Sequence, residues 1–331
     1  MTFFDVFNGD ADGICALHQL RLAEPRQAEL VTGVKRDISL VQRVDVAKAD
    51  AVTVLDVSMD KNTQALQDLL DADIPVFYAD HHFPGDIPEH KALTAHIDTD
   101  ANTCTGLIVN RFLQDAHLRW AVTAAFGDNL HTAATDAAKP LDLSATELSQ
   151  LEELGTLLNY NGYGSALDDL FFKPDDLYRK VQPYENPFDF IAQDSAFITL
   201  KDGLESDMQR ALAIDAHWQS DHCALFVFPD DPFARRVSGV YSNQLARDNP
   251  DRAHALASEL PDGNYLVSVR APLNNKTGAD ELCMQFPTGG GRKAAAGINK
   301  LPVQQLDAFR DAFAARYQSC LLYTSPSPRD S

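Results

Sequence analysis

Aspartate and histidine residues follow a short apolar run in the first third of this sequence, in an order that suits chemistry on a charged ligand. The run 74–78 leads, through one alanine, into Asp80, His81 and His82, and a Pro-Gly turn follows. Because open α/β sheets bind ligands at the carboxyl ends of their strands, this cluster predicts a binding or catalytic role. The alternative interpretation is a turn whose histidines only cap local backbone groups.

Two other apolar runs end near aspartates. The run 3–7 is followed by the segment 8–13, Asn-Gly-Asp-Ala-Asp-Gly, after which a helical pattern begins. One carboxylate would suffice to cap that helix, whereas a second adds repulsion unless a cation compensates it, so we interpret Asp10 and Asp12 as metal ligands. The next such run contains Asp56, a residue that is costly to bury unless it is paired or metal-bound.

Asp128 follows an apolar helical stretch and is a weaker candidate, because an isolated acidic residue is usually an ordinary loop residue. The other candidates lie at the ends of strands of one expected sheet and can therefore converge. Carboxylate oxygens with neutral imidazoles favour Mn²⁺, or Mg²⁺, over a structural zinc ion. Two such ions, about 4 Å apart and bridged by Asp56, could activate water and hold the oxygens of a phosphoryl group.

Strand-like and helix-like segments alternate through the first half of the chain, which predicts a doubly wound parallel α/β sheet. Lys35 and Arg36 stand at one expected strand end, and we interpret them as residues of an ordinary solvated turn. Ser144 with Glu147 predicts a capped helix start. The strands are expected at 3–7, 29–33, 51–58, 74–78 and 95–100. The helices that follow the first are expected at 62–70, 104–109, 120–126, 144–158, 188–200 and 204–218.

A second, smaller α/β domain is expected after a helical connector, which places the domains at 1–219 and 220–318. The tail 319–331 has no hydrophobic periodicity, so we interpret it as a non-native or disordered extension. The second domain's strands are expected at 223–228, 254–258 and 265–270, and its helices at 240–247 and 301–317.

Three consecutive glycines mark the second domain, where Gly289, Gly290 and Gly291 precede Arg292. Glycines let backbone N–H groups approach an anion closely, and the small residues after them could begin a helix whose N-terminus faces that anion. Arg270, at the end of an expected strand, could bind the same anion. The alternative is a flexible glycine loop before a packed helix.

Composition limits the function classes that fit this chain of 331 residues. The net charge of −20 argues against broad binding of extended duplex nucleic acid, although a small anionic substrate could still be held by metal ions and a few local cations. The five cysteines are odd in number and scattered, which indicates a reducing compartment. With no leader-like segment and no apolar run of about 18 residues, a cytoplasmic protein without a membrane span is expected.

These motifs together resemble the DHH phosphoesterases with a C-terminal DHHA1 domain, a superfamily that includes the nano-RNases and RecJ. The resemblance covers nearly the whole chain, to about Tyr317. Segment 8–13 is similar to the first family motif, Asp56 to the second, Asp80 with the two histidines to the third, and Asp128 with the preceding glycine to the fourth. The segment 289–297 is similar to the DHHA1 glycine motif.

The resemblance implies roles for all the candidate residues. Asp10 would bind one metal ion and Asp12 the other, with Asp56 as the bridge, and His81 and Asp128 would complete the second site. His82 would contact the scissile phosphate or help protonate the leaving group, and Asp80 would orient the histidines. The non-scissile part of the substrate would be held by Arg270, Gly289, Gly290, Gly291 and Arg292.

Two positions depart from the family pattern. The family often has a histidine ahead of the first aspartate pair, whereas this chain has Asn8 two residues before Asp10 and Val6 four before. The first metal site would therefore be weaker, or would be completed by the Asn8 oxygen or water. The glycine motif usually continues with histidine, and Arg292 stands there instead. Arginine keeps the affinity for anions but puts the family's usual substrate in question.

The expected function is a Mn²⁺-dependent or Mg²⁺-dependent phosphoesterase with two ions, acting on small nucleotides or short single-stranded oligonucleotides. A cleft between the two domains is the expected place for the substrate. The alternatives are an exopolyphosphatase-like phosphatase and a non-catalytic nucleotide-binding regulatory module, the latter favoured by the absent first-motif histidine. A homodimer is left open.

Overall fold

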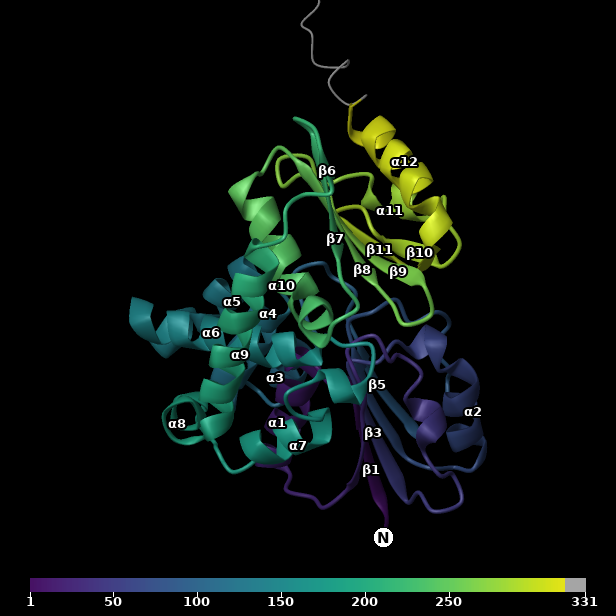
Figure 1. Cartoon of the computed structure of the whole chain (residues 1–331). Coiled ribbons are helices and arrows are strands. Elements are labelled where there is room, and N and C mark those ends of the chain that lie inside the picture. Colours follow the sequence, from purple (N-terminus) through teal and green to yellow (C-terminus); the bar gives the residue numbers. More distant parts are fainter. Residues whose placement is uncertain (319–331) are drawn as a thin grey trace, which may run out of the picture. The chain divides into compact units, whose positions relative to one another are not determined.

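The computed structural model describes residues 1–318 of the chain, which form two compact units with a sheet in each (Figure 1). The first unit is Met1–Leu204, and the second begins at Glu205, inside helix α9 (Ser195–Leu212). The domain boundary predicted near residue 220 stays a prediction. The tail predicted at 319–331 lies outside the described residues.

The first unit contains a parallel sheet of five strands in the order β2-β1-β3-β4-β5, which confirms the predicted fold class. The strand predicted at 74–78 instead runs from Val76 to Asp80, because its backbone pairing with the neighbouring strand continues to the pair Asp80–Ile97. The hydrogen bonds between paired strands are made by backbone groups, so a polar side chain such as that of Asp80 does not end the strand. The strands are β1 (Phe3–Phe7), β2 (Glu29–Val31), β3 (Ala51–Leu55), β4 (Val76–Asp80) and β5 (Leu93–Ile97).

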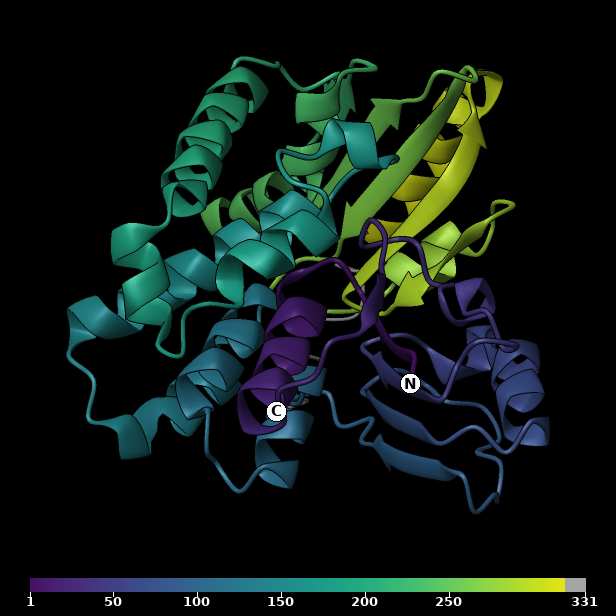
Figure 2. The ribbon, with the colours of Figure 1, turned by 90° about the horizontal axis from the view of Figure 1, so that it is seen from below.

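Helices cover both faces of this sheet (Figure 2). Residues of α1, α3, α4 and α6 form one apolar cluster with Phe7, and those of α2 form another with Phe4 and Val6 on the opposite face. Successive side chains of a strand point to opposite faces, so β1 contributes to both clusters. The helices are α1 (Ala11–Ala23), α2 (Thr63–Asp71), α3 (Thr105–Phe112), α4 (Leu118–Gly127), α5 (His131–Ala138), α6 (Ala145–Gly162), α7 (Pro174–Val181) and α8 (Pro187–Gln193). Short 3-10 turns lie at Val41–Arg43, Met59–Lys61, Lys139–Leu141 and Leu167–Asp169.

Three helix predictions in this region have different outcomes. The capped start of α6 is confirmed, because the Ser144 hydroxyl accepts from the Glu147 N–H at 3.2 Å and the Glu147 carboxylate accepts from the Ser144 N–H at 2.8 Å. The single helix predicted at 188–200 is wrong, because Asp194 adopts an extended conformation and its side chain caps α9 through the Ala196 N–H at 2.8 Å. The helix predicted at 204–218 is likewise the end of α9 followed by strand β6 (Trp218–Gln219).

A buried ion pair ties β1 to α1 in the first unit. The Arg21 guanidinium donates to both carboxylate oxygens of Asp5, at 2.5 and 2.8 Å, and to the Thr53 hydroxyl on β3 at 3.0 Å. The two charged side chains are only 5% and 2% exposed. The pair therefore joins two strands and a helix at a place from which solvent is excluded.

The second unit contains a six-stranded sheet in the order β10-β11-β9-β8-β7-β6, in which β7 and β8 are parallel and the other neighbours antiparallel. Helix α10 (Pro232–Asp248) packs with Phe226 and Leu256 on one face, and α11 (Ala279–Cys283) and α12 (Leu306–Gln318) contribute to the apolar cluster on the other. Its other strands are β7 (Cys223–Phe228), β8 (Ala253–Glu259), β9 (Asn264–Arg270), β10 (Gly289–Arg292) and β11 (Ala295–Pro302), and a 3-10 turn lies at Val303–Gln305.

The glycine segment forms a β-hairpin, so the predicted glycine loop leading into a helix is wrong. Gly289 pairs with Ile298 across the hairpin, and β11 also pairs with β9. This long-range pairing outweighs the weak local helix preference of the small residues in β11. A Cβ atom at Gly289 would lie 1.8 Å from the Cys283 carbonyl oxygen, so only glycine permits that approach.

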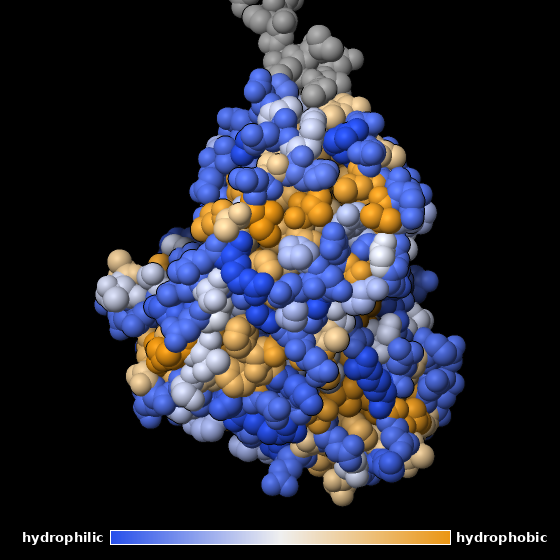
Figure 3. All heavy atoms as spheres, viewed as in Figure 1, coloured by the Kyte–Doolittle hydropathy of each residue, from blue (hydrophilic) through white to orange (hydrophobic). Residues whose placement is uncertain are grey.

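No helix among the described residues is long and apolar enough to cross a bilayer. On the face drawn in Figure 3, hydrophilic side chains predominate and apolar ones form separate groups. Four of the five cysteines are free and buried, and Cys320 lies outside the described residues.

Candidate metal centre

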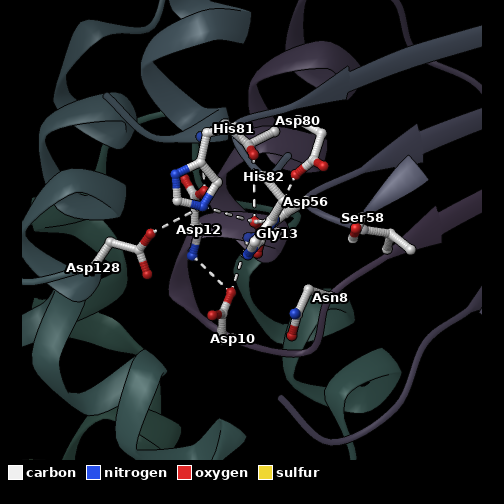
Figure 4. A network of polar contacts seen from close by, with 12 residues as sticks. Asn8, Asp10, Asp12, Gly13, Asp56, Ser58, Asp80, His81, His82 and Asp128 are labelled. Carbon is white, nitrogen blue, oxygen red and sulfur yellow. Dashed lines mark hydrogen bonds and ion pairs between the residues drawn. The ribbon is translucent and has the colours of Figure 1, made fainter. Parts of the chain in front are cut away.

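The carboxyl ends of three neighbouring strands carry six of the seven residues predicted as metal ligands or catalytic groups (Figure 4). Asp10 and Asp12 lie where the chain passes from β1 into α1, Asp56 follows β3, and the two histidines follow β4. Asp128 comes from elsewhere, as the C-cap of α4. All of them gather in one network of polar contacts, which the strand-end argument predicted for every one of them except Asp128.

His81 lies at the middle of this network. Its Nε2 is 3.5 Å from Asp56 Oδ1 and 3.5 Å from Asp128 Oδ2. Its Nδ1 lies 3.1 Å from the Thr103 carbonyl oxygen, which accepts a hydrogen when Nδ1 is the protonated nitrogen. That tautomer leaves the Nε2 lone pair facing the carboxylates, the arrangement by which a backbone acceptor orients a metal-binding histidine.

The Asp56 backbone adopts a left-handed conformation with φ of 57°. Aspartate and asparagine tolerate this region better than other non-glycine residues do. The Thr105 hydroxyl also donates to Asp56 Oδ1, at 3.4 Å. This turn, made directly after the strand, places the carboxylate beside the histidines.

Asp12 is held rigidly by the start of α3. Its two oxygens accept from the backbone N–H groups of Thr105 and Gly106, each at 2.7 Å. A Cβ atom at Gly106 would lie 2.4 Å from Ala124 Cβ and 3.1 Å from Asp12 Oδ1, so glycine is needed for this approach. Asp12, His81 and Asp128 offer ligand atoms within 4.8 Å of one another, as do Asp56, His81 and His82.

His82 is oriented by Asp80. The His82 Nδ1 lies 2.7 Å from Asp80 Oδ1, and the Asp80 side chain is fully buried, whereas 38% of the His82 side chain is exposed. An imidazole held by a buried carboxylate and open to solvent suits proton transfer to a bound ligand. This geometry agrees with the roles that the family resemblance implies, which stay predictions.

Lys35 belongs to this site, although its sequence context indicated only a solvated turn. Its ammonium contacts Asp10 Oδ2, Asn159 Oδ1 at 2.9 Å and Asp128 Oδ1 at 3.3 Å, and 24% of its side chain is exposed. The available signal was its place just after β2, since β2 pairs with β1 in a parallel sheet and ends at the same edge.

Asn8 faces the segment that carries this lysine. Its Nδ2 donates to the Lys35 carbonyl oxygen at 3.3 Å, and its buried Oδ1 has no hydrogen-bond partner among residues 1–318. Asp10 caps α1, because its Oδ1 accepts from the N–H groups of Asp12 and Gly13, each at 3.1 Å. The predicted metal-binding roles of Asp10 and Asn8 stay predictions.

The cluster holds more negative charge than its own side chains balance. Burial raises the pKa of Asp12 to about 6, and the charge of Asp128 adds to the effect. Burial and then the charges of Asp10 and Asp12 raise the pKa of Asp56 well above its usual value. For Asp10, burial also disfavours the charge, but the Lys35 ammonium outweighs it and lowers the pKa. Carboxylates crowded in this way fit a divalent cation, for which oxygen ligands with one or two imidazoles are a suitable set.

These shifts predict that the metal-free protein loses stability as the pH rises. Asp12 and Asp56 have higher pKa values in the folded chain than the unfolded value near 3.8, so the folded state binds more protons from about pH 4 to pH 6 and above. The pKa of Asp10 is lowered in the folded chain, so its ionised carboxylate stabilises that chain. This contribution to stability is lost only as the pH falls below about 4. We expect the melting temperature in EDTA to fall by several degrees from pH 5 to pH 7.5.

Saturating Mn²⁺ is the control for this titration, because a bound cation stabilises the ionised carboxylates and should abolish or reverse the decline. A melting temperature in EDTA that rises steadily from pH 5 to pH 7.5 would contradict the destabilisation of the folded chain by these buried, mutually repelling carboxylates. Thermal unfolding followed by circular dichroism gives both curves.

The predicted substrate-binding residues lie in the second unit, where the two arginines occupy matching positions on the two strands that pair with β11. Arg270 of β9 pairs with Ala295 of β11, and Ala295 pairs with Arg292 of β10. Paired residues point to the same face, so both arginines flank the small alanine on that face. Arg270 Nε donates to Asn243 Oδ1 of α10 at 2.9 Å, which fixes its direction.

Three solved structures are similar to this chain over almost its whole length. The exonuclease RecJ bound to manganese has a TM-score of 0.60 and 16% identity, with 95% of this chain and 89% of that chain covered. The pGpG-specific phosphodiesterase PggH from Vibrio cholerae has a TM-score of 0.55 and 13% identity, covering 95% and 98%. CDC45 from Entamoeba histolytica has a TM-score of 0.54 and 9% identity, covering 96% and 95%.

This chain has the fold of the DHH superfamily. The resemblance stated from the motifs is thereby confirmed for the fold. No family model and no curated protein matches the sequence. With identities of 9–16%, the likeness establishes the DHH fold, and the activity has to be argued from the residues of the site.

Proposed function

We propose that this DHH-fold protein is a metal-dependent phosphodiesterase that hydrolyses short oligonucleotides or small nucleotides. The observation that carries the proposal is the pairing of two features at one sheet edge. Carboxylates and His81 form a ligand set for a divalent cation, and beside them stands His82, exposed enough to reach a ligand and held by buried Asp80.

The side chains have distinct parts in this reaction. A bound divalent cation would lower the pKa of a water molecule and neutralise charge on the phosphoryl oxygens. Asp12, Asp56 and Asp128 hold ligand oxygens at the edge of the sheet, with His81 between them. His82 binds the scissile phosphate or gives a proton to the leaving oxygen, while Asp80 keeps its imidazole in one orientation.

Short substrates fit the charge of the chain. A net charge of −20 opposes a long polyanion, whereas Arg270 and Arg292 offer a local positive face for a single phosphate or nucleotide. The similar pGpG-specific phosphodiesterase and RecJ exonuclease support a nucleotidic substrate. Manganese as the preferred ion, the cytoplasmic location and the homodimer remain predictions.

Arg292→Ala is expected to raise the KM for a dinucleotide about tenfold to a hundredfold, with kcat little changed. A hydrogen bond between a charged group and phosphate contributes about 1.5–3 kcal/mol, and one made equally in the ground and transition states affects KM alone. Arg310→Ala is the matched control, because Arg310 is paired with Asp307 and Asp311 on α12. An unchanged KM would remove Arg292 from the binding site.

The function is tested with the full chain and Mn²⁺ or Mg²⁺, offered a dinucleotide, a short oligonucleotide and polyphosphate. Mononucleotide and inorganic phosphate are measured separately. Mononucleotide release is the expected result, and phosphate release from polyphosphate alone would indicate a phosphatase. Bound metal and bound nucleotide without any product would contradict an enzymatic role and favour a regulatory module.

A further inference from the structure

We propose that the Lys35 ammonium takes the place of one of the two metal ions, so that the centre binds a single divalent cation. The inference rests on the proposed function, since it concerns the same centre. It replaces the two-ion site expected from the sequence by one ion and one tethered cation of the chain itself.

The ammonium group is surrounded by oxygens as a small cation would be. Its contacts are Asp10 Oδ2 from the turn after β1, Asp128 Oδ1 from the end of α4 and Asn159 Oδ1 from α6. An ammonium group has three hydrogens to donate, and these three acceptors match them in number. Two of the three acceptors are carboxylates, so they balance the positive charge of the ammonium group as well as accepting its hydrogens.

The backbone around Lys35 is fixed on both sides. Its N–H donates to the Gly162 carbonyl oxygen at 2.8 Å, at the end of α6, and its carbonyl oxygen accepts from Asn8 Nδ2 at 3.3 Å. Asn8, which precedes the first aspartate pair, therefore contacts the segment that carries the lysine. The ammonium also lies 5.6 Å from the centre of the Tyr163 ring, within the range of a cation–π contact.

Asp10 lies on the lysine side of the cluster, and its contacts are with the start of α1 and with the ammonium group. Its Oδ1 caps α1 and its Oδ2 contacts the ammonium. Among residues 1–318, the groups of side chains close enough to hold an ion are Asp12–His81–Asp128 and Asp56–His81–His82, and neither includes Asp10. The ligand set for an ion therefore lies on the histidine side of the cluster.

His81 is common to both groups and limits them to one ion. A neutral imidazole has one lone pair for a metal, and when Nδ1 donates to the Thr103 carbonyl oxygen that lone pair is on Nε2. Nε2 faces Asp56 and Asp128 at equal distances of 3.5 Å. The two groups thus describe alternative parts of one coordination shell around His81.

The charges also favour one ion. Asp10, Asp12, Asp56 and Asp128 carry four negative charges when ionised, and one divalent ion with Lys35 supplies three positive charges. A second divalent ion near Asp10 would stand against the ammonium and be repelled by it. The lysine therefore neutralises the half of the centre that a second metal ion would otherwise occupy.

The test is the number of Mn²⁺ ions bound per chain, measured without substrate by isothermal titration and by elemental analysis after dialysis. We expect one ion in the wild type and two in Lys35→Ala, because that change frees oxygens of Asp10, Asp128 and Asn159. Lys61→Ala is the matched control, since Lys61 is an exposed lysine paired with Asp60, and it should bind one ion. Lys35→Met, which keeps much of the side-chain volume, should also bind two.

Two ions in the wild type, or one ion in folded Lys35→Ala and Lys35→Met, would overturn the inference. If the variants do not fold, the wild-type count decides alone. Electron paramagnetic resonance provides an independent readout, because only two neighbouring Mn²⁺ ions give a spin-coupled spectrum.

Assaying the same wild-type sample on a dinucleotide separates the two proposals. Product with two bound ions would sustain the phosphodiesterase and reject the role of Lys35. One bound ion without product from any phosphodiester would sustain the role of Lys35 and reject the phosphodiesterase activity.

Discussion

Replacing Asp56 by asparagine is expected to lower the rate of phosphodiester hydrolysis about a thousandfold while making the metal-free protein more stable. The loss of activity follows from the position of Asp56, whose Oδ1 lies 3.5 Å from His81 Nε2 and 3.8 Å from His82 Nδ1. Removing one preorganised electrostatic group from an active site typically costs about 10²–10³ in rate, and a metal ligand is at the upper end of that range.

The gain in stability has the opposite origin. Burial and neighbouring carboxylates raise the pKa of Asp56 well above its usual value, so its charge destabilises the folded chain in the absence of metal. Asparagine removes the charge, keeps an oxygen for the Thr105 hydroxyl and tolerates the left-handed backbone with φ of 57°. Activity and structural stability are therefore in conflict at this position.

Both effects are measured on one pair of proteins. Initial rates with Mn²⁺ and a dinucleotide give the activity, and thermal unfolding in EDTA at pH 7.5 gives the stability. Asp60→Asn is the control, because Asp60 is a partly exposed residue whose carboxylate pairs with Lys61, and it should change neither quantity much. An Asp56→Asn protein that keeps its activity, or that melts lower in EDTA, would show that Asp56 does not have this place in the centre.

Replacing Asp5 by alanine is expected to lower the free energy of unfolding by about 3–5 kcal/mol. The change leaves the Arg21 guanidinium, whose side chain is only 5% exposed, without its carboxylate partner. A buried charge that loses its partner is strongly destabilising, whereas the intact pair itself contributes little net stability. Since Arg21 also donates to Thr53, the loss should be felt by both β1 and β3.

Urea denaturation followed by circular dichroism measures this difference. Asp45→Ala is the comparison, because Asp45 and Lys48 form an exposed pair with side chains 44% and 67% exposed, and its loss should cost under about 1 kcal/mol. Asp5→Leu combined with Arg21→Met should recover most of the stability, since both charges are then removed together. Equal losses for Asp5→Ala and Asp45→Ala would contradict the buried-charge argument.

Local sequence patterns were sufficient for the first sheet and for most of its site residues. Short, mostly apolar runs alternate with helical patterns in the first half of the chain, and this alternation favours parallel strands with crossover helices. The carboxyl ends of parallel strands lie at one edge of a sheet. The sequence alone therefore predicted that four side chains would lie close together, those of Asp10, Asp12, Asp56 and His81. The start of α6 was equally local, since Ser144 and Glu147 satisfy each other's backbone within one turn.

The tertiary structure decided the features that depend on residues far apart in the sequence. The glycine segment became strand β10 because β11 pairs with both it and β9. Lys35 entered the metal centre because Asp128 and Asn159, which follow it by 93 and 124 positions, lie beside Asp10 in the folded chain. The type of residue and its spacing determine which chemistry is available at each strand end. Long-range packing decides which charges neutralise one another, and no local pattern encodes it. The proposed number of metal ions in the centre depends on that neutralisation.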